Sequence, residues 1–257
     1  MKLNLKRRLC ILFLLPFYMV ASANTSIKDY QKNTYQTYIH TDFSSWTAWI
    51  EQMQNQAFKE KNLSLHLEAL KDFYGYIGHL LDTKQNDLAD DWTDVAKEYV
   101  LEVKKDFPNN ADITAYESIF ISFQIAVSPY KAPFLVSSLM KTSKKALKLN
   151  PNSVPAQMAK ANILFYFPEA FGGNKKEALH SYLKMYAHYD KHPEQKQTDW
   201  RYLFLLTIIA NAYEQVGNLP TAIEWTRKSL AIEPKFRYAK EKLLPTLERK
   251  AKEKTNI

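Results

Sequence analysis

The sequence predicts an all-α protein, built as an α-solenoid of antiparallel helix pairs. Glycine occurs only five times in 257 residues, and turn-dense β architectures need more residues that accept a positive φ. No proline lies between Pro16 and Pro108, which leaves room for long uninterrupted helices. Apolar residues recur at helical spacing in successive segments joined by short connections, and no segment shows a convincing strand alternation.

The first 23 residues have the layout of a secretory signal peptide. Residues 2–8 are basic, residues 9–20 are apolar, and residues 21–23 (Ala-Ser-Ala) offer small side chains to a signal peptidase. We therefore expect cleavage after Ala23 and a periplasmic or secreted protein. Retention of the segment as a membrane anchor is the alternative, although its apolar run is short for a span.

Cysteine content and charge narrow the function further. The sole cysteine, Cys10, lies in the signal segment, so the mature chain has no thiol for a disulfide, a thiolate metal site or a nucleophile. Removal of the segment lowers the formal net charge from +8 to +4. Nucleic acid is not an expected partner of an exported chain with so small a charge.

The N-terminal part is expected to contain a leader and then divergent helical repeats. Residues 24–41 are polar without an apolar period, and they are predicted to form a flexible leader. Residues 42–110 are predicted to hold divergent repeats, with helices over 42–58, 62–81 and 87–107. Asn62 is a good N-cap for the second of these. Gly75 and Gly78 inside that helix predict the close approach of a neighbouring helix.

The remaining residues, 111–257, are predicted to form regular repeats closed by a basic capping helix. Helices are expected over 112–128, 133–149, 153–167, 174–190, 199–216 and 219–232, followed by a helix from Lys235. Residues 235–254 include eight basic and three acidic side chains. This excess predicts either a solvated helix face or a peripheral association with the cell envelope.

Small residues at fixed places give the repeat signature. Each has a packing reason: alanine and serine allow neighbouring helices to approach closely, Tyr213 fills the space between them, Gly217 permits a tight turn, and Pro234 begins the next helix. A second copy of the pattern is recognisable upstream, and its last turn, Ala-Leu-Lys-Leu-Asn-Pro, matches the later Ser-Leu-Ala-Ile-Glu-Pro. The signature residues are Ala161, Ala178, Ala210, Tyr213, Gly217, Ala222, Ser229 and Pro234.

This signature resembles the tetratricopeptide-repeat (TPR) family, and the resemblance implies a TPR-like superhelix. The segment 168–178 (Pro-Glu-Ala-Phe-Gly-Gly-Asn-Lys-Lys-Glu-Ala), with Gly172 and Gly173, resembles a P-x-x-F-G-G insertion of exported bacterial TPR proteins from Bacteroidetes-like organisms. That group usually has aspartate where this chain has Asn174. The resemblance implies a binding or assembly role in the cell envelope and supplies no reaction.

The predicted partner site lies on the groove that the first helix of each pair lines in TPR proteins. Asn162 and Asn211 fall at matching places just after a small residue, and an asparagine offers donors and an acceptor to an extended backbone. The flanking residues are Phe165, Tyr166, Glu214 and Gln215. The alternative is that both asparagines form hydrogen bonds within the helix stack.

No reaction or cofactor is predicted. His180, His188 and His192 share a helical face, but Pro193 ends that helix, and neither a metal site nor a catalytic triad is expected. The favoured function is a non-catalytic scaffold that binds a protein or peptide. The alternative is a small-molecule or lipid carrier that assists an envelope transporter. An open groove would favour the first, and an enclosed aromatic pocket of several hundred Å³ the second.

Overall fold

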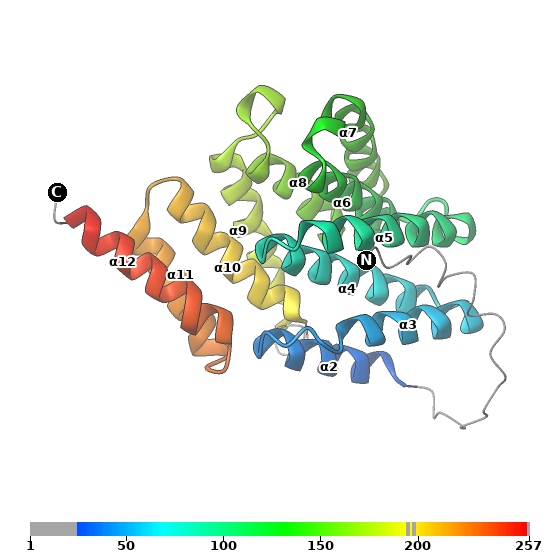
Figure 1. Cartoon of the computed structure of the whole chain (residues 1–257), viewed down its shortest axis with the longest axis horizontal. Helices are drawn as coiled ribbons and strands as arrows, with labels where there is room; N and C mark the ends of the chain where they lie inside the picture. Colours follow the sequence, from blue (N-terminus) through cyan, green and yellow to red (C-terminus); the bar gives the residue numbers. More distant parts are fainter. Residues whose placement is uncertain (1–24, 194–195, 197–198, 256–257) are drawn as a thin grey trace.

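The computed structural model describes residues 25–193, 196 and 199–255, so the predicted signal peptide lies outside the described residues. Every regular element in this part of the chain is helical, and the prediction of an all-α solenoid is confirmed (Figure 1). The elements are α2 (Ile27–Ile39), α3 (Trp46–Glu60), α4 (Leu63–Asp82), α5 (Asn86–Asp106), α6 (Ala111–Val127), η1 (Pro129–Lys131), α7 (Ala132–Leu149), α8 (Val154–Tyr166), η2 (Glu169–Phe171), α9 (Lys175–Lys191), α10 (Trp200–Gln215), α11 (Leu219–Ile232), the π-helical η4 (Tyr238–Leu243) and α12 (Leu244–Thr255).

Consecutive helices pack as hairpins. The pairs are α4 with α5, α6 with α7, α8 with α9 and α10 with α11, and the first helices also pack on one another, α4 on α6 and α6 on α8. Polar N-caps begin many of these helices. Asn62 is the predicted cap of α4, and its Oδ1 accepts hydrogen bonds from the backbone N–H groups of Ser64 and Leu65.

The expected flexible leader is instead the helix α2, so that prediction is wrong. Ser26 and Asp29 form a capping box at its start, each side chain accepting from the other's backbone N–H. The buried face carries Tyr30, Thr34, Tyr35 and Ile39. The stripe has helical spacing, but tyrosine and threonine supply most of it, so an aliphatic period was absent from the sequence.

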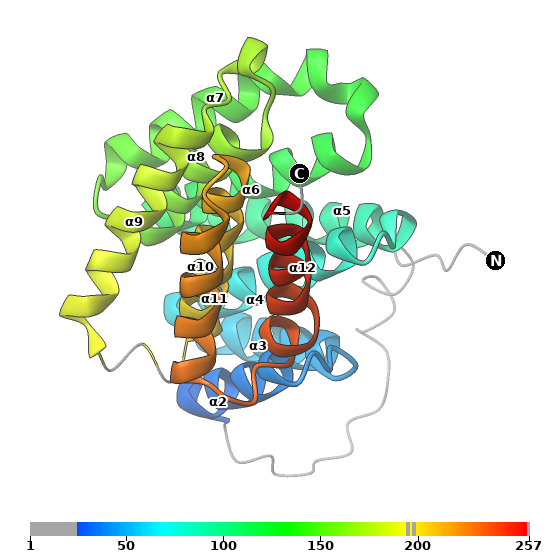
Figure 2. The same ribbon diagram turned by 90° about the vertical axis from the view of Figure 1, so that its left-hand side faces the viewer.

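Helix α2 brings distant parts of the solenoid together. It packs on α3, on α4 and on α10 (Figures 1 and 2). The Tyr35 hydroxyl donates to Glu233 at 3.3 Å, and Tyr38 stacks on Phe236 with ring centroids 5.3 Å apart. In a simple solenoid each repeat contacts only its neighbours. Here the N-terminal helices close against the last repeat, and the inner side of the superhelix is packed with side chains.

Gly75 leaves room for two tryptophan rings against α4. A Cβ atom built at Gly75 would lie 2.7 Å from ring atoms of both Trp200 and Trp46. The missing side chain is therefore needed at Gly75, but it accommodates rings from α10 and α3 and not the backbone of a neighbouring helix. At Gly78 a Cβ would meet nothing within 4 Å, so the prediction is wrong there.

The small residues of the signature are buried between helices. Ala161, Ala178, Ala210 and Ala222 are fully buried, and the last two pack against Leu243 and Leu247 of the C-terminal helices. The Tyr213 ring stacks on Trp225 of α11 at 6.4 Å. Gly217 has φ +85° in the turn between α10 and α11, a conformation that favours glycine.

The turn at Pro234 differs from the prediction, and the P-x-x-F-G-G segment shows why its glycines are needed. Pro234 lies in a turn closed by the Phe236 N–H and the Glu233 carbonyl, and the next helix begins only afterwards. In the P-x-x-F-G-G segment Gly172 has φ +88°, and a Cβ at Gly173 would lie 1.8 Å from the Phe167 carbonyl oxygen. Both positions of the insertion therefore require glycine.

No single helix of the described residues combines the length and the apolar character needed to cross a bilayer, whereas one bent pair, Ala111–Val127 with Pro129–Leu149, meets those two criteria with a 120° bend.

Candidate functional site

Asn162 lies in the core and not on an open groove. Its Nδ2 donates to the Tyr74 hydroxyl at 3.2 Å, and its Oδ1 accepts from the Tyr182 hydroxyl at 2.9 Å. Both tyrosines are buried. The alternative in which the asparagine hydrogen-bonds within the stack is therefore correct for Asn162, because the Tyr74 side chain of α4 reaches the inner face of α8.

Phe165 is also a core residue, whereas Tyr166 is accessible. Phe165 is 6% exposed and packs edge-on against Tyr182 with centroids 6.0 Å apart. Tyr166 is 62% exposed at the end of α8, and its pKa is raised to about 12 by loss of solvation and, to a smaller extent, by Tyr238 and Asp82. Its ring is open to solvent and lies within electrostatic reach of Tyr238 in η4 and Asp82 in α4.

The predicted α10 residues lie near the C-terminal helices. Burial raises the pKa of Tyr238 to about 12, and Asn211 is close enough to the Tyr238 side chain to oppose part of that rise. Glu214 forms an ion pair with Lys250 of α12. We call Tyr166, Asn211, Glu214, Tyr238 and Lys250 the Tyr166 surface.

Two features of the Tyr166 surface differ from the sequence prediction. The predicted site residue Gln215 is exposed at the end of α10. The contribution of α12 was not predicted, because it depends on tertiary packing: Ala210 and Ala222 pack on Leu247, and this contact brings α12 toward α10. A second ion pair, between Lys242 of η4 and Asp82 of α4, spans 2.7 Å.

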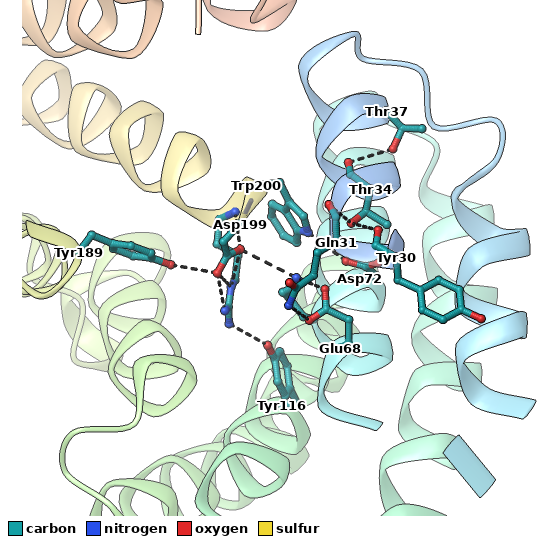
Figure 3. Close-up of polar contacts among 12 residues, drawn as sticks. Tyr30, Gln31, Thr34, Thr37, Glu68, Asp72, Tyr116, Tyr189, Asp199 and Trp200 are labelled. Atoms are coloured by element: carbon teal, nitrogen blue, oxygen red, sulfur yellow. Dashed lines mark hydrogen bonds and ion pairs between the residues drawn. The ribbon is translucent and has the colours of Figure 1, made fainter. Parts of the chain in front are cut away.

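A buried cluster of charged residues lies elsewhere, between α4 and the start of α10 (Figure 3). Trp200 donates from its indole Nε1 to Asp72 Oδ1 at 2.9 Å. Arg201 holds Asp199 through both carboxylate oxygens, with the shortest contact, Nη2 to Oδ2, at 2.6 Å. Lys71 pairs with Glu68, and its Nζ lies 4.0 Å from Asp199 Oδ1.

Tyrosine and glutamine side chains surround the cluster. The Tyr189 hydroxyl donates to Asp199 Oδ2 at 3.4 Å, Arg201 Nη1 donates to the Tyr116 hydroxyl at 3.4 Å, and Gln31 of α2 donates to Glu68 Oε2 at 3.1 Å (Figure 3). Helices α2, α4, α6, α9 and α10 are thereby tied to one polar centre. A sequence signal did exist, because Glu68, Lys71 and Asp72 interrupt an otherwise apolar helix.

The two buried aspartates of the cluster have opposite pKa shifts. Burial raises the pKa of Asp72 to about 8, although Lys71 opposes the shift. Burial would also raise the pKa of Asp199, but Arg201 and then Lys71 outweigh it and lower the pKa to about 2. Burial therefore favours the protonated form of Asp72, whereas the cations beside Asp199 favour its carboxylate. We call Glu68, Lys71, Asp72, Asp199 and Arg201 the clamp.

A pocket of about 390 Å³ opens beside this clamp. Its walls include Glu68, Lys71, Asp112 and Arg201, and Tyr116 is the one aromatic residue among its lining residues. The pocket therefore differs from the enclosed aromatic cavity that a lipid carrier was expected to have.

Metal binding finds no support in the geometry of the histidine face. The rings of His188 and His192 lie 4.5 Å apart. Within the described residues, however, no three His, Cys, Asp or Glu side chains come together as a group that could hold a metal ion.

Comparison with known proteins identifies the architecture. A scan against protein-family models gives no match, and neither does a search among curated protein sequences. Among solved structures, the fold is similar to a thermophilic TPR protein of Thermus thermophilus. The TM-score is 0.53 at 15% sequence identity, over 86% of this chain and 98% of that one. Together with the stacked hairpins and the buried small residues, this similarity shows that the chain has a tetratricopeptide-type helical-repeat fold.

Proposed function

We propose that the protein is an exported, non-catalytic scaffold that binds a segment of a partner protein on the Tyr166 surface. The observation that carries the proposal is the exposure of Tyr166, which is 62% exposed at the end of α8 and lies within electrostatic reach of Tyr238. Tyr238 in turn lies near Asn211 and Glu214 of α10, and Glu214 forms an ion pair with Lys250 of α12. An exposed aromatic side chain near hydrogen-bonding and charged groups is a common feature of protein-binding sites.

The TPR-like fold supports this function, because helical-repeat proteins of this type generally act as scaffolds for protein interaction. The peptide would contact side chains of α8, α10 and α12, which differs from a groove lined by the first helices alone. The carrier alternative lacks a corresponding observation, since the pocket of about 390 Å³ is lined by charged residues and belongs to the clamp.

Site-specific photocrosslinking tests the binding surface. A benzoylphenylalanine at position 166 should crosslink a discrete partner from the envelope fraction of the cells that produce the protein. The matched control is the same group at position 58 of α3, where Phe58 is 41% exposed. Asn211→Ala with Glu214→Ala should reduce the crosslink at position 166. Equal crosslinking from both positions, or none from position 166, would contradict the proposed site.

Export is a separate part of the proposal and has its own test. The basic, apolar and small-residue segments of residues 1–23 support it. Helix α2 is capped at Ser26, so cleavage after Ala23 would leave the capping box intact. The protein recovered from the periplasm or the medium should have the intact mass of a chain that begins at Asn24. Recovery of the uncut chain from the cytoplasm would contradict export.

A further inference from the structure

Helix α7 has an outer face that is unusual in charge. Residues 118–168 contain six lysines and no aspartate or glutamate. Four of these lysines are exposed on α7 at spacings of three, four and seven residues, which places them on one side of the helix: Lys141, Lys144, Lys145 and Lys148. The opposite side carries Leu139, Ser143 and Ala146, which are buried. The lysine stripe therefore faces away from the protein.

Two large aromatic side chains lie at the beginning of the same helix. Phe134 is 84% exposed, and it precedes Lys141 by two helical turns on the same face. Tyr130, in the connection before α7, is 75% exposed. They are the two most exposed of the large apolar side chains in the described chain, so most of each ring is in contact with solvent.

The neighbouring connection adds a third exposed ring. Phe171 in η2 is 56% exposed. The connection before α7 and the connection after α8 share one apolar cluster built from α6, α7 and α8. Leu135 and Phe167 both pack on this cluster. Figure 1 places the α6–α7 and α8–α9 connections at the same edge of the molecule.

We propose that the lysine stripe of α7, with Tyr130 and Phe134 at its end, docks on an anionic lipid surface. Lysines near such a surface each contribute to binding, and aromatic rings are favoured at the level of the lipid headgroups. The stripe offers lysine and serine and no acidic group, which fits a uniformly negative surface. Tyr130 lies in the 3-10 turn before α7 and Phe134 in the first turn of α7. A bilayer interface accepts such exposed rings without a preformed pocket, whereas a protein partner would need one. This site is distinct from the Tyr166 surface and from the basic C-terminal helix.

A local fluorescence probe tests the proposal on the full chain. In a Cys10→Ser background, Phe134→Cys carries the environment-sensitive dye NBD, and Leu101→Cys on α5, where Leu101 is 53% exposed, is the matched control. The dye at position 134 should shift to shorter wavelength with vesicles that contain phosphatidylglycerol in phosphatidylcholine, and not with phosphatidylcholine alone. The dye at position 101 should not shift. Because the signal is local, attachment through residues 1–23 would not produce it.

Charge reversal distinguishes binding through the α7 lysines from attraction of the vesicles by the net charge of the whole protein. Lys144→Glu with Lys145→Glu should raise the lipid concentration for a half-maximal shift by more than about tenfold. Lys252→Glu with Lys254→Glu changes the net charge equally and should have a much smaller effect. Circular dichroism of each variant checks that the helices remain folded.

Three results would overturn the proposal. The first is an absence of any shift at position 134 with anionic vesicles. The second is an equal loss from the α7 and the C-terminal charge reversals, which would indicate net charge alone. The third is a shift with soluble polyglutamate but not with vesicles, which would assign the face to an acidic protein.

Discussion

Trp200 of α10 and Asp72 of α4 are joined by one hydrogen bond across the inner side of the solenoid. The indole Nε1 of Trp200 in α10 donates to Asp72 Oδ1 in α4 at 2.9 Å, between residues 128 positions apart in the sequence. The same indole lies over Gly75 and meets the Trp46 ring at a centroid distance of 5.5 Å. Both partners are buried, so the pair fixes how far the superhelix closes.

Asp72→Asn should remove a pH dependence of stability. The pKa of Asp72 is raised to about 8 in the folded protein from an ordinary value of 3.8. The folded chain therefore keeps a proton that the unfolded chain releases, and stability is lost as pH rises from about 4 to about 8. Asparagine mimics the protonated acid. The free energy of unfolding of the variant, relative to that of the wild type, should therefore rise by up to about 1.4 kcal/mol per pH unit in that window. Urea unfolding at several pH values measures the difference, and parallel pH profiles would contradict it.

Asp199→Asn should behave in the opposite way. The pKa of Asp199 is lowered to about 2, so its contribution is present above the ordinary value of 3.8 and is lost as pH falls toward 2. Removing the carboxylate leaves Arg201 without its buried partner, which costs about 3–5 kcal/mol at neutral pH. The same titration should show this loss shrinking in acid; a loss that is constant down to pH 2 would reject the assigned pairing.

Gly75→Ala and Gly78→Ala form a matched pair within α4. Alanine at position 75 would press a methyl group against Trp200 and Trp46, and the overpacking should cost about 1–3 kcal/mol, more than the gain in helix propensity returns. Alanine at position 78 meets open space and should stabilise the helix by about 0.5–1 kcal/mol. The midpoint temperatures of thermal unfolding should shift in opposite directions for the two variants. A shift of the same sign for both would contradict the close contact of the tryptophan rings with Gly75.

Asn162→Ala should destabilise the core. The change leaves the hydroxyl groups of Tyr74 and Tyr182 without their buried partner, which costs about 1–3 kcal/mol. Asn211→Ala, at a partly exposed position, should cost less than half as much. Denaturant unfolding compares the two variants. Equal stability of Asn162→Ala and the wild type would mean that Asn162 is not bound in the stack.

Ala210→Leu should overpack the last hairpin and cost about 1–3 kcal/mol. Ala210 is fully buried against Leu243 and Leu247, with no room for a longer side chain. Ala187→Leu on the exposed side of α9 is the control and should change the unfolding free energy by less than about 0.5 kcal/mol. A neutral result for Ala210→Leu, measured by denaturant titration, would mean that the repeat is aligned in the wrong register.

The hairpins could be predicted because they depend on local patterns. Capping residues such as Asn62, the glycine turn at Gly217 and the small residues Ala210 and Ala222 each act within a few residues or on the adjacent helix. The exposure of the candidate site residues was harder to predict. Tyr166 is exposed, but Asn162 and Phe165 belong to the core, since the sequence does not say which inner positions a distant helix covers.

The sequence by itself determined the helices, their pairing and the repeat that stacks them, because spacing, caps and small side chains are encoded locally. Only the tertiary structure decided that α2 is a helix packed on α10, that Trp200 of α10 reaches Asp72 of α4, and that Glu68, Lys71, Asp72, Asp199 and Arg201 form one buried clamp. These features depend on side chains more than a hundred positions apart, and burial makes their charges and hydrogen bonds costly unless they meet.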